Sequence, residues 1–398
     1  MPQTQTYMPT ATVVREAALP TGHLEVRISP YSTCQDIDEY IGFAARDNAK
    51  RGFLFVSRVL GKHVPVTPSR MRKAHVALAN SIDVSTGDSF VFVGMAETAT
   101  GLGYGTFEAF QRSVPDVPAL YVHTTRYWMD DDALTFEESH SHAPNLCLHV
   151  ALDPRVRAQQ EAANVLVLVD DELSTGRTFA HLVREYRLRY PAVEKVQVLT
   201  LCDFSGSLAA DTIIDGPDVR VSIDALLMGD HIFLPSCASG HGNPQSSAQP
   251  SKHAHPNLGG GFGRRPVSTA LRIDDVVGAP ELISLAKLDT LRIKVVGTGE
   301  FMHGAYVLGA WLEDRGHEVH VQSTTRSPIL PGYGAINNAC RVSDHYGEGV
   351  PNFLYNHFPD DYELTLVCCE GPANQSTRSI ASTLSARIVQ FVHHSDFP

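Results

Sequence analysis

The chain has 398 residues, 43% of them hydrophobic and 19% charged, a composition typical of a globular protein with two domains. Acidic residues outnumber basic ones by 44 to 32, so the formal charge of −12 disfavours nucleic acid as the main partner. No run approaches the ~18–20 apolar residues of a membrane helix, and no secretory signal is visible. Seven scattered cysteines without a CxxC pair argue against a disulfide framework or a zinc site, and we expect the protein in the cytoplasm.

The first half of the chain alternates strand-like runs with helical patterns. Short β-branched runs bounded by polar or glycine residues predict strands at 89–93, 120–123, 165–169 and 196–201. Between the last two, apolar residues from Phe179 to Tyr190 recur at helical spacing, and Pro191 ends that pattern. Strands that alternate with helices predict a parallel sheet covered by helices on both faces.

The segment 236–266 nearly lacks apolar residues and predicts a flexible linker, whose histidines we interpret as solvated loop residues. The alternation restarts after it, with strands predicted at 291–296, 319–322, 363–369 and 386–392 and a helix at 302–315. We therefore expect one α/β domain at 1–235, the linker at 236–266, and a second, smaller α/β domain at 267–398. Neither core should depend on residues 240–261, so cutting or shortening this stretch should leave two folded pieces.

The segment 165–178, VLVLVDDELSTGRT, carries most of the chemical information. A buried strand delivers Asp170 and Asp171 to its carboxyl end, where open α/β sheets place their ligands. The hydroxyl-rich turn then opens a helix whose N–H groups form an anion site, and Gly176 permits close approach of the backbone. Paired carboxylates beside a phosphate cradle suit a sugar phosphate. The alternative is a polar turn whose residues only cap the helix.

This segment resembles the phosphoribosyl pyrophosphate (PRPP) signature of type I phosphoribosyltransferases, the family of orotate and hypoxanthine phosphoribosyltransferases. The resemblance implies that Asp170 and Asp171 hold the ribose hydroxyls and, through PRPP, an Mg²⁺ ion. It also implies that the loop binds the 5-phosphate through Ser174, Thr175, Gly176, Arg177 and Thr178. Glu172 departs from the aliphatic residue common in the family, and we interpret it as an exposed loop position.

Two upstream segments resemble the pyrophosphate side of the same family. The strand near 89–94 leads into a turn where the backbone N–H groups of Ala96, Glu97 and Thr98 would face the leaving group. Residues 56–65 resemble the basic glycine turn of orotate phosphoribosyltransferases, from which Arg58 and Lys62 could neutralise pyrophosphate. A solvated basic turn is the alternative for this second segment.

Residues 124–143 lie where the family keeps a flexible catalytic loop that closes over the substrate. We expect Arg126 to reach pyrophosphate, and Glu138, His140 or His142 to act in acid–base catalysis. The alternation of Glu138, His140 and His142 could instead ligate a metal.

Residues 270–395 resemble the TRSP domain, which is named for the residues found here at 325–328. Two turns after predicted strands are candidate sites in it, and their residues are Gly297, Gly299 and Glu300 in one and Thr325, Arg326 and Ser327 in the other. The first turn is weak evidence for a nucleotide, because His303 stands where GxGxxG requires its third glycine. In the second, hydroxyls around Arg326 form a candidate phosphate grip. The alternative is a loop that Arg326 braces against an acid such as Glu300 or Asp344.

Together the two resemblances cover nearly the whole chain, a pairing similar to phosphoribosyltransferase–TRSP proteins of tellurium-resistance-type bacterial gene clusters. They imply a Mg²⁺-dependent phosphoribosyltransferase that moves ribose 5-phosphate from PRPP to a base-like acceptor, releases pyrophosphate, and serves biosynthesis of a nucleotide-like metabolite. Two other classes stay open, namely a phosphohydrolase or pyrophosphatase acting on PRPP or nucleotides, and a non-catalytic PRPP-binding regulator. The acidic charge disfavours a regulator that needs a nucleic-acid surface. A homodimer is compatible with the family resemblance.

Overall fold

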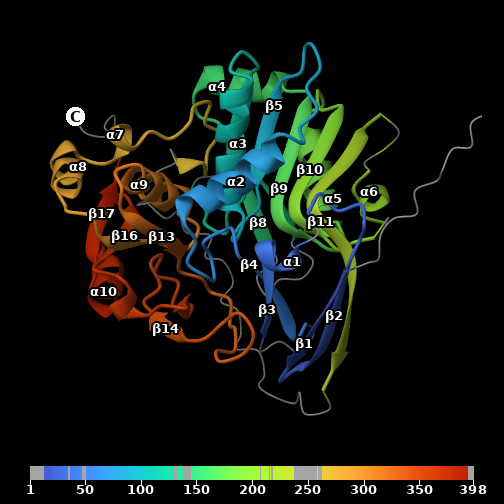
Figure 1. Ribbon diagram of the computed structural model, residues 1–398. Helices are drawn as coiled ribbons and strands as arrows, with labels where there is room; N and C mark the ends of the chain where they lie inside the picture. The colour runs from blue at the N-terminus through green and yellow to red at the C-terminus, as the bar shows by residue number, and fades with distance from the viewer. Residues whose placement is uncertain are drawn as a thin grey trace, which may run out of the picture.

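The computed structural model describes residues 13–34, 36–46, 51–129, 132–137, 145–206, 208–214, 216, 218–236, 258 and 262–392. The first half is built on a seven-stranded sheet of order β1-β2-β11-β10-β9-β5-β6 (Figure 1). Its strands are β1 (Val13–Leu19), β2 (Gly22–Ile28), β5 (Phe90–Gly94), β6 (Ala119–His123), β9 (Val165–Leu173), β10 (Lys195–Asp203) and β11 (Arg220–Pro235). The five strands from β11 to β6 run parallel, which confirms the predicted parallel sheet, and all four predicted strands are present.

The runs of valine and leucine in these strands are buried because helices cover both faces of the sheet. The helices of this half are α1 (Ile37–Tyr40), α2 (Pro68–Ala79), α3 (Thr100–Ser113), α4 (Pro154–Ala162), α5 (Arg177–Arg189) and α6 (Leu208–Ile213). Alternate residues of β9 point to opposite faces. Val167 therefore packs in one core with α2 and α3, and Leu168 in the other with α5. The predicted helix near 179–190 is thus confirmed as α5.

A smaller group of antiparallel strands was not predicted from the sequence. Strand β11 begins parallel to β10 and continues antiparallel to β2, which in turn pairs with β1. Two short hairpins complete this half, β3 (Ile41–Ala45) with β4 (Phe53–Ser57) and β7 (Ala133–Glu137) with β8 (Asn145–His149). Polar residues alternate with apolar ones in β2, which is why this hairpin covers the core with one face only.

The second half is a four-stranded parallel sheet of order β13-β12-β16-β17. Its strands are β12 (Arg292–Gly297), β13 (Glu318–Ser323), β16 (Leu364–Glu370) and β17 (Arg387–Phe391), which confirms the four predicted strands. Its helices are α7 (Ile273–Val276), α8 (Ala279–Ala286), α9 (His303–Glu313), α10 (Gln375–Thr383) and the 3₁₀ turn η2 (Pro359–Asp361). A hairpin of β14 (Ala339–Val342) and β15 (Asn352–Tyr355) lies beside the sheet. In the described part of the chain, no helix is long and apolar enough to cross a membrane.

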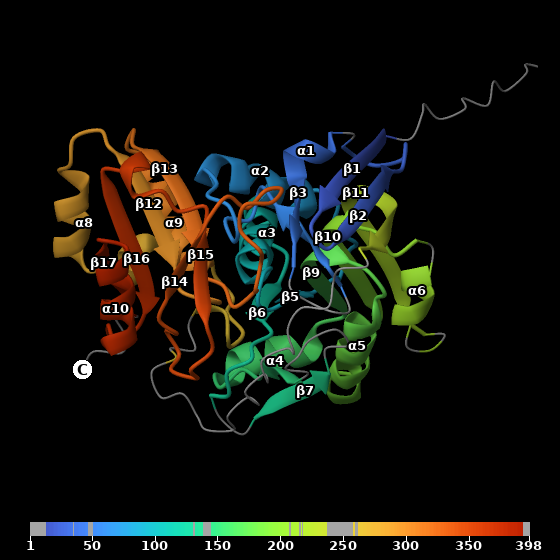
Figure 2. The ribbon, with the colours of Figure 1, turned by 90° about the horizontal axis from the view of Figure 1, so that it is seen from below.

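The two halves share hydrophobic cores. Helix α9 packs against α2 and α3, so these helices lie between the two sheets (Figures 1 and 2). Val66 of the first half joins the core of the second, where its backbone exchanges hydrogen bonds of 3.0 and 2.8 Å with Val321. Ala44 and Val56 form another buried cluster with Ile329 and its neighbours.

The predicted linker 236–266 is corrected at its C-terminal end. Phe262 is buried in the core of the second half, and Arg264 is only 1% exposed. Val267, just beyond the predicted boundary, exchanges two backbone hydrogen bonds of 2.8 Å with Tyr121. The ion pairs of Arg264 and the backbone pairing of Val267 with Tyr121 hold this stretch between the two halves. The polar composition of the stretch does not reveal these contacts.

Candidate active site

The acid pair and the loop predicted to bind phosphate lie at the carboxyl end of β9. Asp170 and Asp171 are half-buried in the last part of the strand, where the Asp171 N–H donates to Asp170 Oδ1 at 2.9 Å. Ser174 to Gly176 form the turn, and α5 begins at Arg177. Gly176 has φ of 73° and its missing Cβ would lie 3.3 Å from the Ala209 carbonyl oxygen, so the turn requires glycine.

The residues of this turn that are predicted to bind the ribose 5-phosphate differ in exposure. Thr175 and Arg177 are exposed, whereas Ser174 and Thr178 are half-buried. The first N–H groups of α5 point out of the helix end, where the helix dipole favours an anion. Burial, supported by the neighbouring Glu172 charge, raises the pKa of Asp171 to about 6.

Glu172 is corrected from an exposed loop residue to a buried partner of Arg51. Its side chain is 15% exposed, and the Arg51 guanidinium donates to its two oxygens at 2.7 and 2.9 Å. The same guanidinium lies 4.6 Å from the centroid of the Phe53 ring. Glu172 therefore fixes the β3–β4 hairpin beside the acid pair, which an aliphatic residue could not do.

The predicted pyrophosphate turn follows β5, beside the acid pair. The Met95 N–H donates to the Val169 carbonyl at 2.9 Å, which places this turn against the end of β9. The Ala96 N–H donates to Thr124 Oγ1 at 2.8 Å, so it faces the loop after β6, in contrast to the expectation that it faces the leaving group. Thr98 is half-buried in the same turn.

Lys62 and Glu97 form a buried ion pair at this turn. Their Nζ and Oε1 atoms are 2.9 Å apart, and their side chains are 1% and 15% exposed. Burial alone would raise the pKa of Glu97, but the charges of Lys62, Arg326 and Arg126 outweigh it and hold that pKa below its ordinary value. Lys62 is thus engaged with protein groups rather than solvated, while Arg58, the other predicted basic residue, is exposed.

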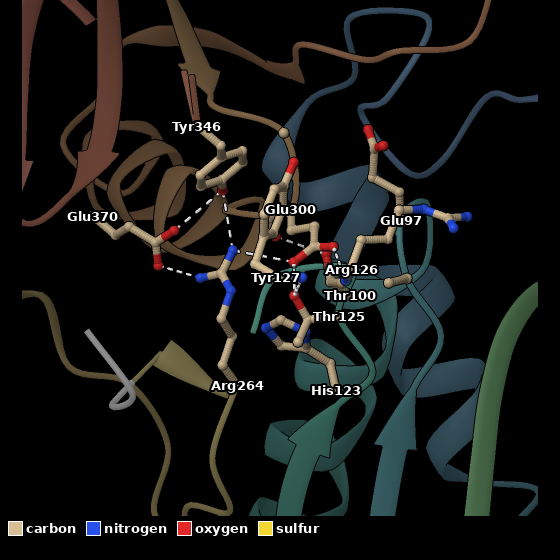
Figure 3. Close-up of polar contacts among 12 residues, drawn as sticks. Glu97, Thr100, His123, Thr125, Arg126, Tyr127, Arg264, Glu300, Tyr346 and Glu370 are labelled. Carbon is tan, nitrogen blue, oxygen red and sulfur yellow. Dashed lines mark hydrogen bonds and ion pairs between the residues drawn. The ribbon is translucent and has the colours of Figure 1, made fainter. Parts of the chain in front are cut away.

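The second-half residue Glu300 contacts the two loops that flank the pyrophosphate turn (Figure 3). Its carboxylate accepts hydrogen bonds from Thr125 Oγ1 at 2.6 Å and from the Arg126 N–H at 3.1 Å. Its carbonyl oxygen accepts one from Thr100 Oγ1 at 2.8 Å. Arg126, a residue of the predicted catalytic loop, is half-buried. Its backbone N–H is held by Glu300 of the second half.

Arg264 lies at the centre of a buried polar cluster between the halves (Figure 3). Its guanidinium pairs with Glu370 and, at 3.1 Å, with Glu300, and it donates to the Tyr346 hydroxyl at 3.0 Å. Burial opposes its charge, yet the carboxylates raise the pKa of Arg264 above its ordinary value. Burial and the Arg264 charge lower the pKa of His123 to about 3, so that ring is neutral.

Arg326 is engaged by acids of its own half and by a tyrosine of the other. It donates to Glu348 Oε2 at 2.7 Å and to the Tyr127 hydroxyl at 2.5 Å, and lies 3.9 Å from Asp344 Oδ1. Burial opposes the charge of Arg326, but the neighbouring Tyr127, Glu97 and Glu348 outweigh it and raise the pKa of Arg326 above its ordinary value. The bracing alternative for Arg326 thus has acidic partners, Glu348 and Asp344, but not the suggested Glu300.

The remaining second-half candidates mainly shape the turns. Gly297 ends β12 where a Cβ would lie 2.3 Å from the Phe301 carbonyl oxygen, and Gly299 has φ of +56° under the Tyr346 ring. Thr325 Oγ1 accepts from the Ser327 N–H at 3.2 Å, so these hydroxyl residues close their own turn. The proposed acid–base residues Glu138, His140 and His142 lie outside the described residues.

Sequence reasoning missed Arg264, Tyr127, Tyr346 and Glu370. Arg264 stands in a glycine-rich stretch that looks like linker, and Glu370 ends a strand with no motif around it. The one available signal was the position of Glu370 at the carboxyl end of a predicted strand, where ligands and polar contacts gather.

The fold and the strand-end loops define an α/β protein whose first half has the architecture of a type I phosphoribosyltransferase. Residues 40–230 match a protein-family model described as phosphoribosyl transferase, and residues 259–386 match one described as the TRSP domain C-terminal to it. The chain therefore belongs to the phosphoribosyltransferases that carry a C-terminal TRSP domain.

Solved structures of adenine phosphoribosyltransferases are similar to this chain. The enzyme of Trypanosoma brucei, solved with AMP, pyrophosphate and ribose-5-phosphate, is 11% identical with a TM-score of 0.34, over 48% of this chain and 77% of its own. The enzyme of Leishmania donovani is 14% identical with a TM-score of 0.33, over 50% of this chain and 80% of its own. No curated protein matches the sequence.

Proposed function

We propose that the protein is a PRPP-dependent phosphoribosyltransferase that transfers ribose 5-phosphate to a base-like acceptor and releases pyrophosphate. The observation that carries the proposal is the order strand, acid pair, glycine turn and helix at 165–178, which lies beside the turn after β5. Such an edge suits a ligand with a hydroxyl pair at one end and phosphates at the other. Membership of the family supports the same reaction class.

In this proposal the 5-phosphate lies at the first turn of α5. Ser174, Thr175 and Thr178 supply hydroxyl donors there, Arg177 supplies charge, and the helix dipole favours the anion. Asp170 and Asp171 then accept hydrogen bonds from the 2- and 3-hydroxyls, because both lie one turn away at the strand end.

The reaction breaks the bond between C1 of the ribose and the pyrophosphate oxygen, and the electron pair leaves with pyrophosphate. An acceptor nitrogen forms the new bond to C1 and gives its proton to a base, a role that we assign to Glu138 or His140. Developing positive charge on the sugar is stabilised by the nearby carboxylates, while Arg126 and Arg58 face the leaving group.

Mg²⁺ would fit this site through PRPP rather than through a protein cage. Among the described residues, no group of three acids, histidines or cysteines could hold a metal by itself. Asp170 and Asp171 would therefore contact the ion indirectly, and bound Mg²⁺ would offset the negative charge of pyrophosphate.

The acceptor, the pathway and the setting follow from the family resemblance alone. We propose a role in making a nucleotide-like metabolite, in the cytoplasm, within a tellurium-resistance-type gene cluster. The acceptor is a small base-like molecule, and neither nucleic acid nor a membrane is part of the proposed reaction.

The test incubates the protein with PRPP, Mg²⁺ and a panel of bases and measures pyrophosphate. Transfer predicts release that depends on a base, whereas base-independent release would favour the hydrolase. The matched variant is Asp170→Asn with Asp171→Asn, which keeps the shape of both side chains. PRPP binding in it should weaken by roughly 3–6 kcal/mol, from two charge-assisted hydrogen bonds. Unchanged affinity by calorimetry would contradict the site.

A further inference from the structure

The turn after β12 in the TRSP domain contacts two residues predicted for the pyrophosphate side, Lys62 and Arg126, and also the start of α3. Gly299 accepts a hydrogen bond from Lys62 Nζ at 2.8 Å through its carbonyl oxygen. Glu300 accepts from Thr100 at the start of α3 and from Thr125 and Arg126 in the loop after β6. One turn of the second domain thus holds three separate segments of the first.

These contacts are buried, and several involve a charge. Lys62 is 1% exposed, Thr125 is 0% and Glu300 is 3%. Hydrogen bonds to a carboxylate are about twice as strong as neutral ones, and a dry environment strengthens them further. The contacts therefore restrain the backbone at Arg126 and at the first turn of α3.

We propose that the turn 298–300 of the TRSP domain is part of the PRPP site and that Glu300 is a positioning residue for its pyrophosphate side. The inference rests on the proposed function and extends it across the domain boundary. Glu300 fixes the backbone of the loop that carries Arg126 and orders the helix start behind the β5 turn. Glu300 contacts Thr100, Thr125, Arg126 and Arg264, none of which belongs to the 5-phosphate loop at 174–178, so phosphate binding by that loop should not depend on this residue.

A matched control comes from the second acid of the Arg264 cluster. Glu370 is 2% exposed and pairs with the same guanidinium, but among the described residues its side chain hydrogen-bonds to Arg264 and Tyr346 and not to the loop after β6. Glu300→Gln and Glu370→Gln each remove one buried charge from the same arginine. Only the first variant alters the acceptor of Thr125 and Arg126, so a purely structural role would make the two variants alike.

The experiment measures binding of PRPP, pyrophosphate and ribose 5-phosphate to the full chain by calorimetry. In Glu300→Gln, affinity for PRPP and for pyrophosphate should fall by about tenfold, since a charge-assisted hydrogen bond is weakened, while affinity for ribose 5-phosphate stays the same. In Glu370→Gln all three should stay within about twofold of the parent. Hydrogen exchange of amides 124–127 should quicken only in Glu300→Gln.

Equal affinities for pyrophosphate in the two variants, with both folded, would overturn the inference. Equal losses for pyrophosphate and ribose 5-phosphate would also overturn it, because they indicate a general loss of structure. If Glu300→Gln does not fold, Thr125→Val removes one donor and leaves the Arg264 pair intact, and the same loss is expected. A parent protein that binds no PRPP would instead refute the proposed function, and hydrogen exchange would still decide the role of Glu300.

Discussion

Removing the charge of Arg264 should destabilise the whole chain, and the size of the loss follows from its burial. Arg264→Met keeps much of the side-chain length but leaves Glu300 and Glu370 without their cation. Breaking a buried ion pair from one side costs ~3–5 kcal/mol, because an uncompensated charge remains. For a cooperative unit of 398 residues, that corresponds to a fall in Tm of about 4–6 °C.

The pH dependence gives this prediction a sign. Burial, the Glu300 charge and the loss of Arg264 all act to raise the pKa of Glu370 in the variant. An acid whose folded pKa exceeds its unfolded value binds more protons when folded, so lowering the pH through the folded pKa restores stability. The difference in Tm between variant and parent should therefore shrink as the pH is lowered through the folded pKa of Glu370.

Differential scanning calorimetry measures both effects, and an exposed pair provides the control. Arg292 and Glu363 are 47% and 48% exposed at the edge of the second sheet. Arg292→Met should change stability by less than about 1 kcal/mol. A Tm for Arg264→Met equal to that of the parent, or a deficit that grows on acidification, would refute the reasoning.

Three further outcomes are expected. PRPP affinity should fall as the pH drops through about 6, because protonation of Asp171 removes the charge that strengthens its hydrogen bond to the ribose hydroxyl, and Asp171→Asn should reduce that dependence in calorimetric titrations. Arg326→Ala should lower Tm because its ion pair with Glu348 is lost, and unchanged nucleotide-monophosphate binding in that variant would contradict the phosphate grip. Proteolytic cleavage within 240–257 should leave fragments that co-elute in size-exclusion chromatography, since they share buried cores, and separate elution would contradict the shared interface.

Local patterns were sufficient to predict the elements that carry the proposed chemistry. The run Val165–Val169 is apolar throughout because both faces of β9 are covered, and the acids that follow mark the strand end. Residues 293–297 of β12 are likewise all buried, although this run includes the charged residue Lys294. The β1–β2 hairpin was missed because only one face packs on the core and the other carries charges.

Contacts between distant parts of the chain were not predictable in the same way. Glu172 lies 121 residues from Arg51, and Lys62 lies 237 residues from Gly299. Nothing in the local sequence of either acid or base specifies such a partner. Residues 262–266 were predicted to belong to the linker for the same reason. Arg264 pairs with Glu300 and Glu370, which are distant in the sequence and lie near it only in the folded chain.

The topology of the second sheet explains why its turns contact the first domain. In the order β13-β12-β16-β17, the chain first moves from β12 to β13 on one side and then crosses back to β16 on the other side of β12. A sheet with this order places its ligand in the crevice between the carboxyl ends of β12 and β16. Glu300 follows β12 and Glu370 ends β16, and both pair with Arg264. Within the part of the chain that the structure describes, this crevice is filled by side chains that join the domains. The carboxyl end of this sheet, where a separate substrate would bind, instead contacts the segments that follow β5 and β6. This contact supports our proposal that the TRSP domain acts through the phosphoribosyltransferase site.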